Sequence, residues 1–346
     1  MIIFLTGAAG LLGGAIAHEL VRRGHGVIGL VHNAADIRGN DGGALQASSF
    51  DGDPPQDGEI LTLRGDIAEP GLGLSESERM AVAQGVDCVI HCAALVRFEA
   101  PSEDLESINV HGTCNVAKQF PNARLVHVST AYSCGLRKGA ISETSHGPND
   151  SFGNGYERSK ALAEHRLLEL RPDAIIARPS IIVGEHKSGQ IRSFDTVYTA
   201  FKFIAEGRVK SVRVDPRSTL NFVPIDHVVE GIVALACDTN AQSEIVHLAA
   251  REAISSELFL SLIGRTPGLR APQIAAPCVE ANGLAGMTER LIQPYLSYFE
   301  RSPQFETNAI TRLVGLKAPQ LDAQDLLKHI SFCVDEGFIK PRQATN

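Results

Sequence analysis

The sequence predicts a doubly wound α/β fold, in which helices cover both faces of a parallel sheet. Two observations lead to this prediction. Short, continuous apolar runs alternate with segments of helical spacing over the first two-thirds of the chain. Strands that are apolar throughout indicate a sheet buried on both faces, and their alternation with helices is typical of α/β architecture. Beyond residue 185 the pattern loosens, and we expect a smaller, mostly helical C-terminal lobe.

Glycines mark the first expected elements. IIFLT (2–6) is an apolar run bounded by glycine and is expected to be the first strand. The helical pattern of 11–23 stops at Gly24, a residue suited to the position after a helix. GVIGLVH (26–32) is the second expected strand. Residues 33–58 are rich in Gly, Asp, Ser and Pro, which predicts a long surface loop.

The alternation of strands and helices continues along the chain. Ser75 and Glu78 fit a capping box for a helix that ends near Gly85. STLNFVPI is strand-like and leads into a helix that we expect Asp226 to cap. Further strands are expected at 59–66, 87–94, 124–130, 174–180 and 244–250, and further helices from Ser102 to Phe120 and over 154–165.

The first turn of the chain predicts a dinucleotide site. TGAAGLLGG spaces Gly7, Gly10 and Gly13 three apart between the first strand and the first helix. Glycines let the backbone turn sharply and let a pyrophosphate approach the free N–H groups of the helix. Contacts with the cofactor are therefore expected from Thr6, Gly7, Gly10, Leu11, Leu12 and Gly13. Because of this turn, we expect a Rossmann-like first domain, formed by 1–184 and parts of 220–250. The remaining segments, 185–219 and 251–346, are expected to form a substrate-binding lobe.

Other strand ends are expected to complete the cofactor site. Asp66, followed by Ile67, comes after the third strand and could hold the adenine amino group; a simple turn residue is the alternative. Ala93 and Ala94 follow the fourth strand, and their small side chains would let the cofactor lie close.

The choice between the two nicotinamide cofactors depends on the end of the second strand. NAD preference usually comes from an acidic residue there, and this chain has His32 instead. The missing acid favours NADP(H), whose extra phosphate a carboxylate would repel, with His32 and Arg38 as its expected contacts. NAD(H) is the alternative, because the arginine that would clamp the phosphate is missing as well.

Tyr156 and Lys160 lie one helical turn apart, so they share a face of the expected helix. A nearby ammonium would lower the pKa of the phenol, and Tyr156 could then donate a proton to a carbonyl oxygen. Thr130, after Ser129 at the end of the fifth strand, would hydrogen-bond the same oxygen. The alternative, that both residues belong to a solvated surface, is disfavoured by the nucleotide turn upstream.

From residue 1 to about 235 the chain resembles the extended short-chain dehydrogenase/reductase superfamily. The resemblance rests on TGAAGLLGG, GDI, HCAA, NVHGTCNV, VSTAY, YERSK, RPSIIVG and NFVPIDHVVEGI. It implies that Thr130, Tyr156 and Lys160 are the catalytic residues and that Asn109 supports the lysine. It also implies that Pro179 and Ser180 lie beside the nicotinamide.

Within the superfamily the chain is similar to the fatty acyl-CoA reductase and thioester reductase (male-sterility) branch, through HCAALVRF, INVHGTCNV, HVSTAY, RPSIIVGEHKSG and DLLKHISFCVDEGFI. The resemblance implies reduction of an acyl thioester, on coenzyme A or a carrier protein, to an aldehyde or alcohol with NADPH. Two positions depart from the branch, which often has an arginine at His32 and a basic residue at Gly14. Because the chain begins at the first strand, we expect a free-standing enzyme that meets its carrier in trans; a homodimer is a further guess by resemblance.

Two segments of the second lobe bear on substrate docking. FKFIAEGRVKSVRVDPRS (201–218) carries Lys202, Arg208, Lys210, Arg213 and Arg217. It could dock coenzyme A phosphates or an acidic carrier protein, or it could be an ordinary surface with local salt bridges. GEHKSG (184–189) could be a lid or a simple interdomain loop.

Three other functions stay open. The protein could be a ketoreductase or alcohol dehydrogenase acting on a small molecule, or a nucleotide-sugar epimerase or dehydratase. A redox sensor that binds NADP without turnover is the non-enzymatic alternative, disfavoured by the catalytic tyrosine. The seven scattered cysteines and the histidines show no metal-binding spacing, so we expect buried thiols and no metal.

Overall fold

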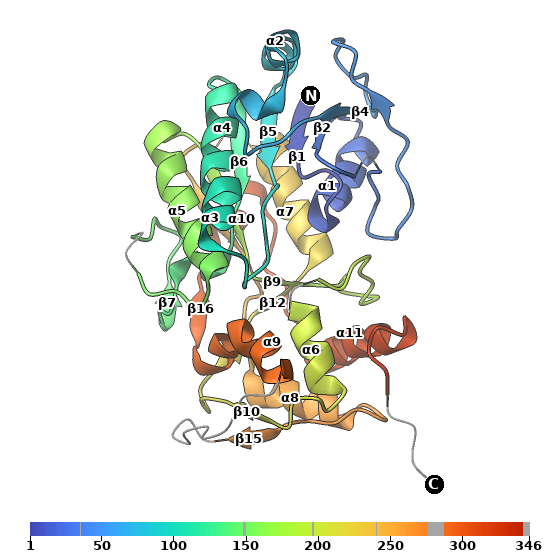
Figure 1. The fold of residues 1–346 in the computed structure, drawn as a ribbon, viewed down its shortest axis with the longest axis vertical. Coiled ribbons are helices and arrows are strands. Elements are labelled where there is room, and N and C mark those ends of the chain that lie inside the picture. Colours follow the sequence, from blue (N-terminus) through green and yellow to red (C-terminus); the bar gives the residue numbers. More distant parts are fainter. Residues whose placement is uncertain (35, 148–149, 196, 240, 276–286, 342–346) are drawn as a thin grey trace.

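A parallel sheet of eight strands organises the larger part of the molecule (Figure 1), in the order β13-β8-β6-β5-β1-β2-β4-β3. The computed structural model describes residues 1–346 apart from 35, 148–149, 196, 240, 276–286 and 342–346. The strands are β1 Ile2–Thr6, β2 Gly26–Val31, β3 Ser48–Ser49, β4 Ile60–Arg64, β5 Cys88–His91, β6 Arg124–Val128, β8 Ile175–Pro179 and β13 Ile245–Leu248. The order reverses direction between β1 and β5, and such a switch point places a crevice at the carboxyl ends of the strands.

Helices cover both faces of the sheet, which confirms the doubly wound α/β prediction. Ile3 of β1 packs with α1 (Leu11–Arg22), α7 (Ile225–Cys237) and α10 (Asn308–Val314), whereas Phe4 faces the opposite core. Alternate strand residues point to opposite faces, so both must be apolar. The opposite face is covered by α2 (Glu76–Gly85), α4 (Gly112–Gln119) and α5 (Gly155–Leu170).

Two expected helices differ from the sequence pattern. The predicted helix from Ser102 to Phe120 is interrupted, because α3 (Ser102–Leu105) passes into a π-helical turn, Glu106–His111, before α4. The predicted cap of α7 is wrong: Pro224 is at the N-cap, two residues before Asp226, and the helix begins at Ile225. Asp226 instead accepts a hydrogen bond from the backbone of His186 at 3.1 Å, so it ties the 184–189 loop to the helix.

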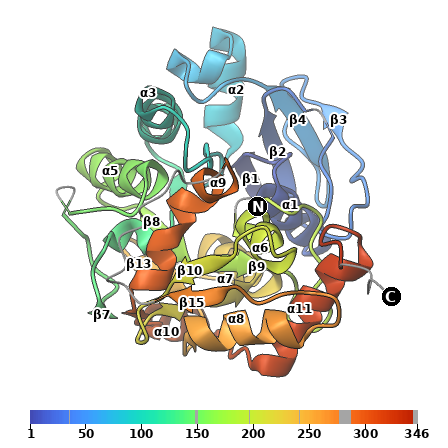
Figure 2. The same cartoon turned by 60° about the horizontal axis from the view of Figure 1, so that its bottom comes forward.

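The second lobe lies beyond the carboxyl ends of the strands (Figure 1), and Figure 2 shows its paired strands β10 and β15 beside α8. Its helices are α6 Val197–Ala205, α8 Ser256–Arg265, α9 Met287–Leu296 and α11 Ala323–Asp335. Its short strands are β10 Ser211–Arg213, β11 Thr219–Leu220, β14 Ile254–Ser255 and β15 Gln273–Ala275. The pairs β9 Ile181–Val183 with β12 Phe222–Pro224, and β7 Gly139–Ile141 with β16 Pro303–Phe305, complete the fold.

The glycine-rich turn is closely packed on its surroundings. Gly7 has a φ of +72°, and a Cβ there would lie 2.8 Å from the backbone nitrogen of Ala93. A Cβ on Gly13 would lie 2.0 Å from the carbonyl oxygen of Gly7. The turn therefore needs glycine at both positions for its own packing, and the same compactness leaves the backbone open to a ligand.

The loop after β2 folds back over the first turn of α1. A Cβ on Gly14 would lie only 2.1 Å from the carbonyl oxygen of Arg38. The basic side chain that the branch often carries at this position therefore has no room here.

We predict that Gly14→Ala lowers the free energy of unfolding by about 1–3 kcal/mol, because the Arg38 carbonyl must move to admit the methyl group. Chemical denaturation measures this change. Gly85→Ala is the matched control, since a Cβ at this helical glycine meets nothing within 4 Å. Equal stability of the two variants would contradict the close packing of the loop on α1.

Candidate active site

A cavity of about 480 Å³ lies at the switch point, between the glycine-rich turn and the second lobe. Its walls include many of the residues that the sequence predicted for catalysis and cofactor binding. Those that line it are Gly7, Gly10, Leu11, Leu12, Gly13, Ala93, Ala94, Ser129, Thr130, Tyr156, Pro179 and Ser180. Residues far apart in the chain thus meet at one place, as the parallel topology requires.

Thr6 lies behind this cavity and does not line it. Its side chain is fully buried, and its Oγ1 accepts hydrogen bonds from the backbone of Cys92 and Ala93 at 3.2 and 3.1 Å. The hydroxyl is 2.8 Å from Nδ1 of His91, whose Nε2 is 3.0 Å from Thr113 Oγ1. Thr6 therefore joins the ends of β1 and β5 and shapes the cofactor turn from below.

Asn109 lies in the π-helical turn and fastens the loop after β5. Its amide accepts from the backbone N–H of Leu95 at 2.7 Å, and donates to the Leu95 carbonyl at 3.0 Å and to Ser159 Oγ at 2.8 Å. The resemblance implied that Asn109 supports Lys160. In the structure Asn109 instead donates to Ser159, the residue that precedes Lys160 in α5.

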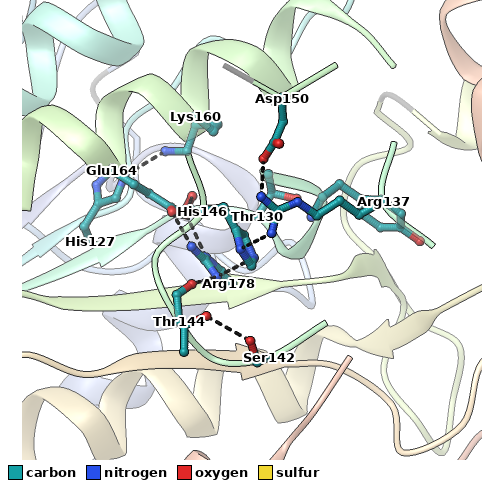
Figure 3. Close-up of polar contacts among 12 residues, drawn as sticks. His127, Thr130, Arg137, Ser142, Thr144, His146, Asp150, Lys160, Glu164 and Arg178 are labelled. Carbon is teal, nitrogen blue, oxygen red and sulfur yellow. Dashed lines mark hydrogen bonds and ion pairs between the residues drawn. The ribbon is translucent and has the colours of Figure 1, made fainter. Parts of the chain in front are cut away.

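Lys160 is 1% exposed and points from α5 toward the end of β6 (Figure 3). Its Nζ donates to the carbonyl of Val128 at 2.7 Å and lies 3.3 Å from Nε2 of His127. Burial lowers the pKa of Lys160 to about 8, and the carboxylate of Glu164 partly opposes this shift. Burial and the nearby ammonium of Lys160 keep the pKa of the His127 imidazole well below its usual value. The ring is therefore neutral and can accept a hydrogen bond from Lys160.

Tyr156 stands in the first turn of α5, with its ring stacked on Phe98 at a centroid distance of 5.6 Å. The predicted lowering of its pKa by Lys160 is not found. Burial raises the pKa of Tyr156 above its usual value of 10.0, and neighbouring Cys92 and Glu157 act in the same direction. The reason is that apolar groups surround the phenol, while the ammonium is directed to Val128 and His127.

The hydroxyls at the end of β6 are held in place by backbone and side-chain contacts. Thr130 Oγ1 accepts from the backbone N–H of Tyr132 at 3.3 Å and lies 3.5 Å from the carbonyl of Pro179. Ser129 donates to Glu164. Thr130 therefore faces the cavity with a fixed orientation, whereas the Ser129 hydroxyl is engaged beneath it.

A buried ion pair lies under helix α5, and the sequence did not predict it. Arg178 of β8 is fully buried and bonds Glu164 of α5 at 2.6 Å (Figure 3). Arg178 also donates to the carbonyl of Thr144 at 3.0 Å and contacts His146. An arginine inside the apolar strand AIIARPS was the available signal, because a buried guanidinium requires an acidic partner.

A second buried pair holds the start of the same helix. Arg301 bonds Glu157 at 2.5 Å and donates to the carbonyl of Gly135 at 3.0 Å. Its guanidinium lies 4.7 and 4.4 Å from the ring centres of Tyr132 and Tyr298. The pair between Glu157 and Arg301 joins residues 144 positions apart, so no local sequence pattern could predict it.

The end of the cavity nearer the second lobe is apolar and aromatic. Its walls there are formed mainly by Val96, Phe98, Tyr132, Ile191, Val197, Tyr198, Tyr295 and Tyr298. Asp195 is the one charged side chain among the described residues that line the whole cavity. Such a surface suits an apolar group better than a charged one.

The residues expected at the adenosine end lie apart from this cavity lining. His32 Nδ1 is 3.7 Å from Asp66 Oδ2, and the other oxygen of Asp66 accepts from the backbone of Ala68 at 2.9 Å. Arg38 is paired with Asp36 at 3.2 Å. Ile67 is buried and packs against Gly112, so its side chain serves the core.

The basic segment 201–218 is partly neutralised on its own surface. Lys202 and Arg208 pair with Glu206 at 3.9 and 2.9 Å, and Arg217 pairs with Asp215 at 3.6 Å. Lys210 and Arg213 are exposed. Within the described part of the chain, no cluster of His, Cys, Asp and Glu has the geometry of a metal site, and no helix is long and apolar enough to cross a bilayer.

Comparisons with known proteins identify the family and agree on the fold. A family model described as male sterility protein matches residues 5–232. The chain is 29% identical over 282 residues to the fatty acyl-CoA reductase wat of Drosophila melanogaster; the match covers 68% of this chain and 54% of that protein. The chain thus spans about half the length of this curated relative.

Solved structures share the fold over nearly the whole chain. The terminal R domain from the myxalamid PKS-NRPS biosynthetic pathway superposes with a TM-score of 0.80 at 23% identity, covering 99% of this chain and 92% of that one. MoeE5 in complex with UDP-glucuronic acid and NAD gives 0.67 at 19% identity, covering 97% and 100%. At these identities the structures establish a common fold alone.

We predict that Glu164→Gln destabilises the protein by about 3–5 kcal/mol, because it leaves the Arg178 guanidinium buried without its charge partner. Glu169→Gln, which breaks an exposed pair with Arg166 on the same helix, should leave the denaturation midpoint unchanged. Burial disfavours the Glu164 carboxylate, but Arg178 holds its pKa below the usual 4.5. The unchanged protein should therefore lose this stabilisation as the pH falls below 4.5, and Glu164→Gln should not. Parallel pH dependences would contradict this assignment.

Proposed function

The chain belongs to the male sterility protein family within the extended short-chain dehydrogenases/reductases, and on that premise we propose that it reduces acyl thioesters with NAD(P)H. The observation that carries the proposal is the single cavity that joins the glycine-rich turn, the hydroxyls of Thr130 and Tyr156 and an apolar aromatic end. A relative named as a fatty acyl-CoA reductase supports the same substrate class.

The residues at the turn fit a dinucleotide. A side chain at Gly7 or Gly13 would collide with the neighbouring backbone, so the turn stays tight, and the free N–H groups of α1 begin there. The residues that would hold the cofactor are Gly7, Gly10, Leu11, Leu12, Gly13, Ala93, Ala94, Pro179 and Ser180. NADP(H) is our preferred cofactor, because β2 does not end in the acid that NAD-binding chains use.

A nicotinamide held at this turn would supply a hydride to the thioester carbonyl carbon. Tyr156 donates its phenolic proton to the carbonyl oxygen, and Thr130 hydrogen-bonds that oxygen while its charge develops. To favour the phenolate that remains, the ammonium of Lys160 would have to turn from the Val128 carbonyl toward Tyr156 in the complex with cofactor and substrate. The resulting hemithioacetal then breaks its C–S bond; its hydroxyl proton goes to the departing sulfur, which gives an aldehyde and a free thiol. A second hydride and proton would give the alcohol.

The lining of the cavity favours an acyl group over a sugar nucleotide. The likeness to MoeE5 makes a nucleotide-sugar enzyme the second candidate. Such a substrate carries a diphosphate, which needs cationic partners. The substrate end of the described lining contains no lysine or arginine, whereas its Phe98, Tyr295 and Tyr298 offer aromatic surface to an apolar chain.

The thioester would arrive on coenzyme A or on an acyl or peptidyl carrier protein in trans. Both carry phosphate groups or acidic surfaces. The exposed Lys210 and Arg213 of the second lobe are the basic residues we propose for this contact. The paired residues around them, such as Lys202 and Arg208, are already compensated by Glu206.

We predict that Tyr156→Phe lowers kcat for thioester reduction by about 100-fold or more, because the proton donor is lost. The assay follows NADPH or NADH oxidation with acyl-CoA, acyl carrier protein and simple thioester substrates, and identifies the aldehyde or alcohol. Cofactor affinity of the variant is the control and should be retained. Undiminished turnover would remove Tyr156 from the mechanism. Reduction of free ketones without any thioester turnover would overturn the proposed substrate class.

We also predict that kcat/KM falls as the pH rises through about 8, because the buried Lys160 loses its proton there in the free enzyme. The measurement is a pH profile of thioester reduction at fixed ionic strength. Lys160→Arg keeps a positive charge throughout this range, so its lower activity should lack the alkaline fall. If the variant retains the same fall, another group is responsible.

A further inference from the structure

Arg192 reaches from the second lobe to the glycine-rich turn. Its neighbours in sequence, Ile191 and Ser193, line the cofactor cavity. Its Nη2 donates to the carbonyl of Gly10 at 2.7 Å. Its Nε is buried and has no hydrogen-bond partner within the described structure. The guanidinium thus lies at the turn where the phosphates of a dinucleotide are expected, with donor capacity unused.

A second arginine belongs to the loop that packs over the same turn. Arg38 belongs to the loop that folds over α1, and the two loops are joined because Asn40 Oδ1 accepts from the backbone of Arg192 at 3.2 Å. Partial burial and then the positive charge of Arg38 lower the pKa of Arg192, although Asp195 opposes this shift. Arg38 is itself paired with Asp36 at 3.2 Å. Two guanidinium groups therefore belong to adjoining loops beside the same turn, and each also has an acidic neighbour.

We propose that Arg38 and Arg192 together bind a phosphate group of the dinucleotide, in place of the basic residues that the branch often carries at positions 14 and 32. Gly14 has no room for a side chain under the Arg38 carbonyl, and His32 faces Asp66. An anion between the two arginines would relieve their repulsion and satisfy the free Nε. This inference rests on the proposed function, and the phosphate is either the 2′-phosphate of NADP(H) or the pyrophosphate.

The test is the dissociation constant of NADPH and of NADH, measured by titration calorimetry without substrate. Arg192→Gln and Arg38→Gln should each weaken NADPH binding by about tenfold or more at low salt, and the double variant by more. Arg192→Lys should recover part of the loss. Arg265→Gln, at an exposed arginine of α8, is the matched control and should bind as the unchanged protein does.

The two phosphate sources are separated by the ligands. Loss confined to NADPH and 2′,5′-ADP assigns the 2′-phosphate, and equal loss for NADPH, NADH and ADP assigns the pyrophosphate. Unchanged affinities in folded Arg192→Gln and Arg38→Gln would overturn the inference while leaving the proposed function in place. If the unchanged protein bound neither dinucleotide, the proposed function would fall and the inference with it.

Discussion

Helix α5 is held between two buried ion pairs, and the geometry of the candidate site depends on them. Glu157 bonds Arg301 at the start of the helix, and Glu164 bonds Arg178 two turns later. Tyr156 and Lys160 lie on the stretch of helix that these pairs fix. Buried pairs contribute little net stability compared with apolar packing, but an unpaired member is strongly destabilising. The pairs therefore favour one position of the helix, and that position fixes where Tyr156 and Lys160 lie.

The sequence predicted the parts of the site whose signals are local. The spacing of Gly7, Gly10 and Gly13 and the distance of one turn between Tyr156 and Lys160 both reflect backbone geometry, so they can be seen without a structure. The environment of those groups could not be seen in this way. Whether the Lys160 ammonium acts on the phenol depends on its contacts with His127 and the Val128 carbonyl. Both belong to strand β6, which is distant from α5 in the sequence.

The limits of prediction have the same cause elsewhere in the fold. A helical pattern runs without a break from Ser102 to Phe120, and the extra residue of the π-helical turn leaves no mark on it. The turn nevertheless places Asn109 where it can fasten the backbone of Leu95. Asp226 looked like a helix cap and instead bonds a loop from another segment. In each case a tertiary contact overrides a correct local preference.

The pair between Glu157 and Arg301 also bears on how the chain is made. A ribosome releases the N-terminal residues first, and domains begin to fold while synthesis continues. The Rossmann strands up to β8 can pair before residue 301 has emerged, but α5 would then carry a carboxylate without its partner against a forming core. We therefore expect helix α5, which carries Tyr156, to reach its final position only once residue 301 is available.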